Sequence, residues 1–213
     1  TQYMVGTNGF MAFNPATARG LGNAALPTAI AGACLYPFWD DLDADIAVNT
    51  NSGIWVRTDG VAPNRTFIVE WYQIGHFNHD VQGGDITFQI KLYEGSNRIQ
   101  FKYLDTQFSG TQAANSNGGS ATVGLESAVG VTPRPATLVG FNTQSVTSGQ
   151  CIEFSQPTPC LPVPVGGTIT VSTVAGVCEG TATVSAPTFN PAGCADGVTN
   201  GLRYRVNGGA NVN

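Results

Sequence analysis

The sequence has few charged residues: only 11% of its 213 residues are Asp, Glu, Lys or Arg, against about 25% in average globular proteins. The nine Lys and Arg residues are scattered along the chain, and the net charge is −5. Because nucleic-acid binding needs grouped cations that neutralise phosphates, we expect no nucleic-acid partner. No apolar stretch reaches the ~20 residues of a spanning helix, so we expect no direct membrane insertion of this segment.

Catalytic motifs are also scarce. The chain has two histidines and no Gly-x-Ser-x-Gly turn, which disfavours a Ser-His-Asp hydrolase. Paired carboxylates could serve a glycoside hydrolase, and Glu70 and Glu126 both fall on expected strands. The same positions suit carboxylates that are hydrogen-bonded for structural reasons. We expect no catalytic residues and no enzymatic activity.

Strand patterns are abundant, and 42% hydrophobic residues suffice for a buried core. Apolar and polar residues alternate with a period of two, which is typical of half-buried antiparallel strands. The expected strands are residues 2–5, 10–13, 34–39, 53–57, 65–74, 86–93, 98–104, 121–126, 137–141 and 150–154. Six large aromatic residues at or beside inward positions are expected in the core: Trp39, Trp55, Trp71, Phe88, Phe101 and Tyr103.

Two stretches lack a strand pattern, and one marks a domain boundary. Residues 14–33 predict a loop with room for one short helix, and residues 109–120 predict a polar, mobile tip. Residues 157–164 form a stiff proline-rich linker. We expect an all-β protein with an antiparallel β-sandwich or jelly-roll-like domain over residues 1–156. A partial Ig-like β-sandwich over 165–213 follows, with strands at 168–173, 180–185 and 202–206.

The acidic segment after Trp39 is the most distinctive local feature. Asp40, Asp41, Asp43 and Asp45 lie within six residues. Alternate residues of an extended segment share a face, so three of these carboxylates could converge on calcium. The alternative is a solvated or hydrogen-bonded acidic turn at the end of a strand. Calcium is the only cofactor that the sequence indicates.

Five cysteines without zinc-site spacing favour disulfides in an oxidising compartment. The preferred pairing joins Cys34 to Cys151 and Cys178 to Cys194, and leaves Cys160 to a partner beyond residue 213. The main alternative joins Cys151 to Cys160. The chain begins within a strand pattern and without an initiator Met, so we expect a segment of a longer protein.

Several blocks of the first domain resemble nidogen-type (NIDO-like) extracellular β domains and their bacterial relatives in secreted surface proteins. The resemblance rests on blocks at residues 7–10, 37–43, 53–57, 67–71, 87–93, 99–103 and 121–126. It implies a non-catalytic adhesion or matrix module and carries over no ligand residues. The part from Cys160 to Cys194 resembles the start of a hyalin repeat (HYR) or a related Ig-like adhesin repeat, although the usual Asp-Asn before the later cysteine is missing.

These observations favour a non-catalytic segment of a large secreted or cell-surface adhesin or structural protein. We expect it outside the cell or on a bacterial cell surface. Its expected partners are an extracellular polymer, a polysaccharide, a protein surface or copies of itself in a filament. The alternative is a carbohydrate-binding accessory domain of a secreted hydrolase.

Overall fold

The computed structural model describes residues 2–13, 20–30, 32–44, 49–78, 85–128 and 135–155, and the backbone of five strands beyond residue 156. The chain divides into two units. Unit 1 comprises Thr1–Gln156 and Leu202–Asn213, and unit 2 comprises Pro157–Gly201.

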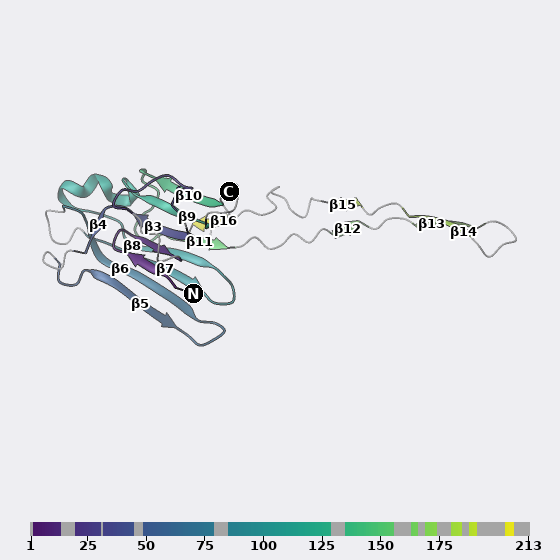
Figure 1. The fold of residues 1–213 in the computed structure, drawn as a ribbon, viewed down its shortest axis with the longest axis horizontal. Coiled ribbons are helices and arrows are strands. Elements are labelled where there is room, and N and C mark those ends of the chain that lie inside the picture. The colour runs from purple at the N-terminus through teal and green to yellow at the C-terminus, as the bar shows by residue number, and fades with distance from the viewer. Residues whose placement is uncertain are drawn as a thin grey trace. The chain divides into compact units, whose positions relative to one another are not determined.

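Unit 1 is a sandwich of two antiparallel sheets (Figure 1). The five-stranded sheet has the order β1 (Met4–Gly6), β2 (Phe10–Ala12), β3 (Cys34–Trp39), β9 (Thr122–Glu126) and β10 (Ala136–Phe141). The seven-stranded sheet has the order β16 (Arg203–Val206), β11 (Cys151–Ser155), β8 (Ile99–Asp105), β7 (Ile86–Tyr93) and β6 (Thr66–His76), with β4 (Leu42–Asp43) and β5 (Gly53–Asp59) both paired to β6. The predicted all-β sandwich is confirmed.

The core lies between the two sheets because each strand sends alternate side chains inward. Its fully buried members include Trp71, Phe88, Ile90, Phe101 and Phe154. Two hydrogen bonds also join the sheets. Trp71 Nε1 donates to the Gly6 carbonyl over 2.9 Å, and the Tyr103 hydroxyl donates to the Pro37 carbonyl over 2.7 Å.

The first hairpin follows the Asn-Gly signal in the sequence. Gly9 has φ +72°, and a Cβ there would lie 1.9 Å from the Phe38 carbonyl oxygen. The Phe38 amide donates to the Gly9 carbonyl over 3.4 Å. Glycine is therefore required here both by the turn and by the close approach of β3.

A bulge in β6 changes the predicted faces of that strand. Simple alternation places Gln73 on the Trp71 face and Ile74 on the opposite one. The register shifts between Trp71 and Ile74, and Gln73 has φ +51°. Ile74 consequently returns to the core, where it is fully buried. One extra residue in a strand has this effect because it displaces the alternation by one position.

A cover segment, residues 20–30, closes the outer side of the five-stranded sheet. It packs Ala24, Leu26 and Ile30 against a second hydrophobic cluster whose buried members are Phe10, Ala12, Cys34, Tyr36 and Trp39. The described part of residues 14–33 contains no helix, in keeping with the loop that its glycines and proline predict.

The stretch predicted as a mobile polar tip is instead the 3-10 helix η1 (Gly110–Gly118). Ser116 is buried, and its Oγ accepts a hydrogen bond from the Phe108 amide over 2.9 Å. Asn117, at φ +62°, accepts one from the Thr106 hydroxyl over 2.7 Å.

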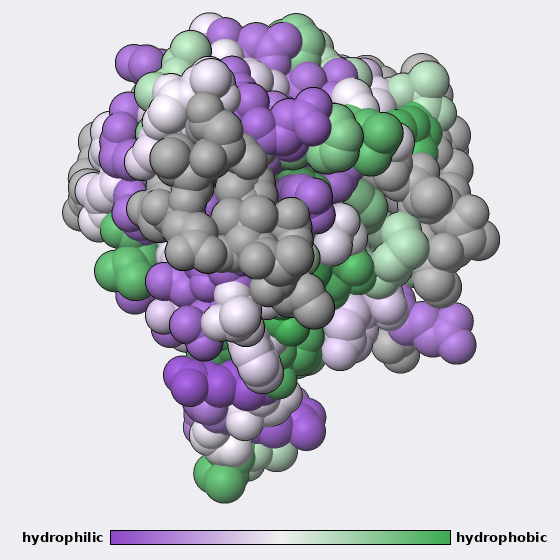
Figure 2. Space-filling view, turned by 90° about the vertical axis from the view of Figure 1, so that its left-hand side faces the viewer, coloured by the Kyte–Doolittle hydropathy of each residue, from purple (hydrophilic) through white to green (hydrophobic). Residues whose placement is uncertain are grey.

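Figure 2 views unit 1 from the end at which η1 lies. Hydrophilic and hydrophobic residues are intermixed among the coloured residues there.

Unit 2 contributes four described strands. They pair as two antiparallel ladders, β12 (Val163–Val165) with β15 (Thr188–Asn190) and β13 (Ile169–Thr173) with β14 (Gly180–Val184). The strand expected at 202–206 is present as β16, but its pairing partner differs from the prediction. It pairs with β11 of unit 1 and not with a strand of the second domain. Pairing partners depend on the fold of distant segments, which local patterns do not reveal. Cys160, Cys178 and Cys194 lie outside the described residues.

Candidate functional site

The acidic segment lies where β3 ends and β4 begins. Asp40 is buried, and its two carboxylate oxygens accept hydrogen bonds from the Asp41 amide over 2.9 Å and from the Ser120 hydroxyl over 2.5 Å. Asp41 and Asp43 are partly exposed, and Asp45 lies outside the described residues. In the described part of the chain, no three His, Cys, Asp or Glu side chains are grouped as metal ligands. Calcium binding by this segment stays a prediction.

His76, at the end of β6, contacts the same carboxylate. Its Nε2 lies 3.6 Å from Asp40 Oδ1, and its Nδ1 lies 3.1 Å from the Phe77 carbonyl oxygen. Burial opposes protonation of the ring and is the largest single effect on its pKa. The hydrogen bonds to Asp40 and Phe77, with the charges of Asp40 and Asp41, outweigh burial and raise the pKa of His76. The imidazole is thus a pH-sensitive tie between β6 and the acidic segment.

This tie makes stability depend on pH in a definite direction. A pKa that is raised in the folded state adds stability below the unfolded value of about 6.5, and this stability is lost as pH rises through the folded value. We expect the melting temperature to fall further between about pH 5.5 and pH 8 in the wild-type protein than in the His76→Gln variant. Scanning calorimetry at both pH values measures this. An equal loss in the two proteins would contradict it.

The predicted Cys34–Cys151 disulfide does not form. Cys34 packs in the cluster beneath the cover segment, on the outer side of the five-stranded sheet. Cys151 precedes the core residue Ile152 on β11 and so points to the outer side of the other sheet. Side chains on opposite outer faces of a sandwich are too far apart for a disulfide. Spacing in the sequence does not show on which face a cysteine lies.

Glu70 and Glu126 are separated in the same way. Glu126 is buried under the cover segment and accepts hydrogen bonds from the Tyr36 hydroxyl (2.6 Å), the Thr28 hydroxyl (2.9 Å) and the Thr28 amide (2.8 Å). Glu70 lies on the outer side of the seven-stranded sheet, where Gln89 Nε2 donates to its Oε1 over 2.5 Å. The two carboxylates share no cleft, so they do not form the pair that glycoside hydrolysis requires.

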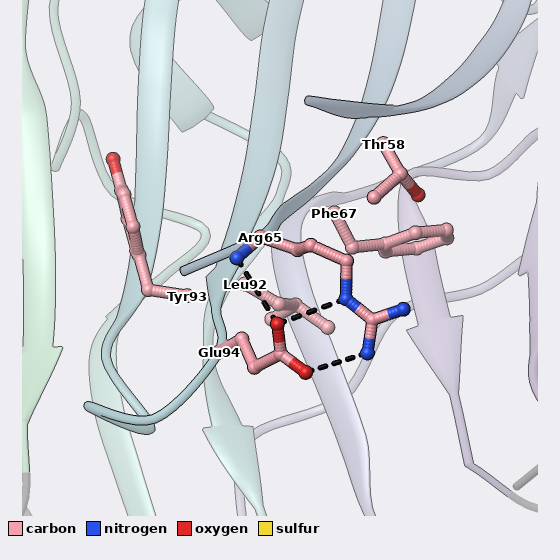
Figure 3. Close-up of a pocket in the computed structure, with 6 residues that line it drawn as sticks. All are labelled: Thr58, Arg65, Phe67, Leu92, Tyr93 and Glu94. Carbon is pink, nitrogen blue, oxygen red and sulfur yellow. Dashed lines mark hydrogen bonds and ion pairs between the residues drawn. The ribbon is translucent and has the colours of Figure 1, made fainter. Parts of the chain in front are cut away.

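One cavity of about 350 Å³ opens where β6 begins and β7 ends (Figure 3). Arg65 and Glu94 face each other there and form a bidentate ion pair, with Nε to Oε2 at 2.8 Å and Nη2 to Oε1 at 2.5 Å. The hydrogen bonds from Arg65 lower the pKa of the Glu94 carboxyl to about 2. Phe67 and Leu92 supply apolar walls. The charges of this cavity already neutralise each other.

The outer side of the seven-stranded sheet is partly exposed. Trp55 and Lys102 are exposed there, Glu70, Gln89 and Lys91 are half-buried, and Ile68 is buried. We call it the open face: the outward side chains of β5 to β8 and β11. Five residues that pair directly from strand to strand form one row across this face: Trp55, Glu70, Gln89, Lys102 and Cys151. Trp55 is 60% exposed, so its predicted place in the core is wrong. Among the described strands β5 pairs only with β6. It is therefore an edge strand, and no neighbouring strand on its other side covers its side chains (Figure 1).

The open face also gathers cations that are scattered in the sequence. Arg57 and Lys91 lie opposite Ile68 on its two sides. Lys91 pairs with Gln100 on β8, and Lys102 follows Gln100 by two residues on the same face. Burial lowers the pKa of Lys91, and repulsion by Lys102 and Arg57 lowers it further. Sequence reasoning missed this cluster, although Lys91 and Lys102 hold outward positions of the predicted alternation.

Other charges of the open face are paired with one another. Arg98 lies over the Tyr93 ring, 4.4 Å from its centroid, and contacts Glu153 at 3.0 Å. Arg57 contacts Asp59 at 3.1 Å. Lys91 and Lys102 form no ion pair with a described residue. The face therefore presents two ammonium groups that have no ion-pair partner among the described residues.

A comparison with protein families identifies the class of domain. The family described as NIDO related matches residues 1–157. This is most of the chain, which therefore belongs to the NIDO-related family. Such domains are typically extracellular. No curated protein and no solved structure matches the chain. Among the described residues, no helix is long and apolar enough to cross a membrane.

Proposed function

We propose that this chain is a non-catalytic segment of a large secreted or cell-surface protein, and that it mediates adhesion or the assembly of a surface layer or filament. The open face carries this proposal. It combines charged, amide and aromatic side chains on a rigid sheet, which is the chemistry of a binding surface.

Two carboxylates buried elsewhere in unit 1 have structural partners. Glu126 holds the cover segment, and Asp40 holds the turn after β3. On the open face, by contrast, Trp55 and Lys102 are exposed. This division between closed and open outer sides supports a binding function for the seven-stranded sheet.

A retention assay tests the proposal. The purified chain is passed over beads that carry extracellular polysaccharides or matrix proteins, and the polymers are sized afterwards. We expect retention on at least one polymer, with its length unchanged. Failure to be retained on every polymer, or a shortening of polymer chains in proportion to the amount of protein, would contradict the proposal.

A second candidate function is that of a carbohydrate-binding accessory domain of a secreted hydrolase. The exposed indole of Trp55 favours it, because aromatic rings stack on the apolar faces of sugars and amides nearby can bind hydroxyls. A Cβ on Gly53 would lie 3.7 Å from Trp55 Nε1, so the indole lies along β5 and leaves a ring surface accessible.

Replacing Trp55 with alanine should weaken polysaccharide retention about 10-fold, since loss of one aromatic stacking contact costs on the order of 1 kcal/mol or more. Isothermal titration of wild type and Trp55→Ala measures the change. Phe77→Ala is a suitable control, because Phe77 is also exposed and lies after the end of β6. Equal losses in both variants would remove the support that Trp55 gives.

The remaining expectations about this chain are also proposals. They are a bacterial cell-surface location, a hyalin-type or Ig-like repeat after the proline-rich linker, and calcium held by Asp40, Asp41, Asp43 and Asp45. Self-association into a filament is compatible with the exposed edge strand β5, because unpaired strand edges can pair with another strand.

A further inference from the structure

The chain contains only two lysines, and both lie on the open face. Lys91 pairs directly with Gln100, and Lys102 follows Gln100 by two residues on the same face. Such diagonal neighbours are about 7–8 Å apart. Arg57 lies two strands from Lys91, about 10 Å away at the usual strand spacing. Three cations of a protein with a net charge of −5 thus become neighbours on one face, where Asp59, Glu70 and Glu153 lie among them.

We propose that the open face binds an acidic polysaccharide, whose carboxylates or sulfates contact Lys91 and Lys102. This inference rests on the adhesive function proposed above and names the class of its partner. Neither ammonium group has a carboxylate partner among the described residues. Burial and, after it, repulsion by Lys102 and Arg57 lower the pKa of Lys91, and an anion bound between the cations relieves the repulsion.

The surface beside Lys102 is shaped for a sugar. A hollow of about 230 Å³ is lined by Glu70, Gln89, Lys102, Leu104 and Gln150, among others. Its carboxylate and amides can accept and donate hydrogen bonds to hydroxyl groups, and Leu104 offers an apolar contact. Trp55 lies in the same row, two strands from Gln89. A polymer that crosses the strands along this row would therefore meet the ring of Trp55, the hollow and Lys102. Lys91 lies beside the row, two residues from Gln89 on β7.

The charge pattern favours a polysaccharide over a nucleic acid. Asp59, Glu70 and Glu153 are interleaved with the cations of this face. They repel a strand that carries a phosphate on every nucleotide. A polysaccharide has neutral hydroxyls between its charges, and carboxylates bind hydroxyls well. The cavity at Arg65 suits an anion less, because Glu94 already neutralises its cation.

Chemical modification of the two lysines tests the proposal on the intact chain. Acetylation removes their charge, and reductive methylation keeps it. The probes are polygalacturonate for carboxylates, dextran sulfate for sulfates, neutral dextran and double-stranded DNA. We expect acetylation to weaken binding of an acidic polysaccharide about 10-fold at low salt, because charge pairing is the main attraction. Methylation should change it less than about twofold. The two acidic polymers distinguish the kind of anion.

Two matched variants each remove one positive charge, one on the open face and one in the cavity at Arg65. Lys102→Gln should weaken binding several-fold and flatten its dependence on salt. Arg65→Gln should leave both unchanged. Equal effects of the two variants overturn the inference, as does tighter binding of DNA or equal binding of neutral dextran. Retention on a neutral polymer or a protein surface, without binding of either acidic polymer, overturns this inference and leaves the adhesive function standing. Lack of retention anywhere overturns both.

Discussion

Replacing Glu126 with alanine should lower the free energy of unfolding by about 3–5 kcal/mol. The change removes a buried carboxylate and leaves the Thr28 amide, the Thr28 hydroxyl and the Tyr36 hydroxyl without their acceptor. Each unsatisfied buried donor costs on the order of 1–3 kcal/mol. The cover segment depends on these bonds, so it should also become sensitive to protease. Denaturant titration followed by tryptophan fluorescence measures the loss, because Trp39 stacks on Tyr36 at 4.9 Å.

The matched control for Glu126 removes one of its donors. Tyr36→Phe should cost about 1–2 kcal/mol, since it breaks a single hydrogen bond and leaves the carboxylate two others. The double variant should lose less than the sum of the single losses, because both changes act on the same bond. A loss below about 1 kcal/mol for Glu126→Ala would contradict the role of this carboxylate as the anchor of the cover segment.

Replacing Trp71 with alanine should cost a further large amount, about 3–5 kcal/mol. Trp71 is fully buried, stacks on Phe88 at 5.0 Å and donates the hydrogen bond to Gly6 that joins the two sheets. The substitution leaves a large cavity and removes the hydrogen bond between the sheets, although the Gly6 carbonyl still accepts one from the Gly9 amide over 3.3 Å. The free energy of unfolding from urea titration gives the value.

Trp55 provides the control for Trp71, since it is the same residue type on the neighbouring strand. Trp55→Ala should change stability by less than about 0.5–1 kcal/mol, because its side chain is mostly exposed. The two tryptophans therefore separate stability from binding: Trp71 is needed for the fold, and Trp55 is available for a ligand. Comparable losses of stability in the two variants would show that Trp55 also belongs to the core.

Local alternation predicted most of the sandwich. The pattern of Ile86, Phe88 and Ile90 on β7 assigned the core side correctly, and so did that of Phe101 and Tyr103 on β8. These strands lie in the middle of a sheet with one buried side, and their apolar residues recur at every second position. The strand bounds expected from the sequence lie within a few residues of those observed.

The errors arose where tertiary structure decides. Gln73 occupies a bulge, which one sequence does not reveal. Trp55 was expected in the core, but it pairs with Glu70 on the outer side of the sheet and is 60% exposed on the edge strand β5. Ser116 and Asn117 belong to a polar stretch that gains its order from contacts with Phe108 and Thr106.

The candidate site was the least predictable part. Arg57, Lys91 and Lys102 are far apart in the sequence and become neighbours only through strand register. Register depends on turns and on the core, and it converts outward positions of separate strands into one surface. The acidic segment, by contrast, is evident in the sequence because its charges lie within six residues of one another. Asp40 nevertheless has a structural role, since its carboxylate holds the turn after β3.

Lysine footprinting of the bound protein tests the central claim most directly, namely that the open face is the contact surface. The chain is labelled with an amine-reactive reagent, alone and on the polymer that retains it, and the extent of labelling is read by mass spectrometry. We predict that Lys91 and Lys102 are both labelled several-fold more slowly when the polymer is bound. Unchanged labelling of both lysines on a polymer that still retains the protein would contradict the account.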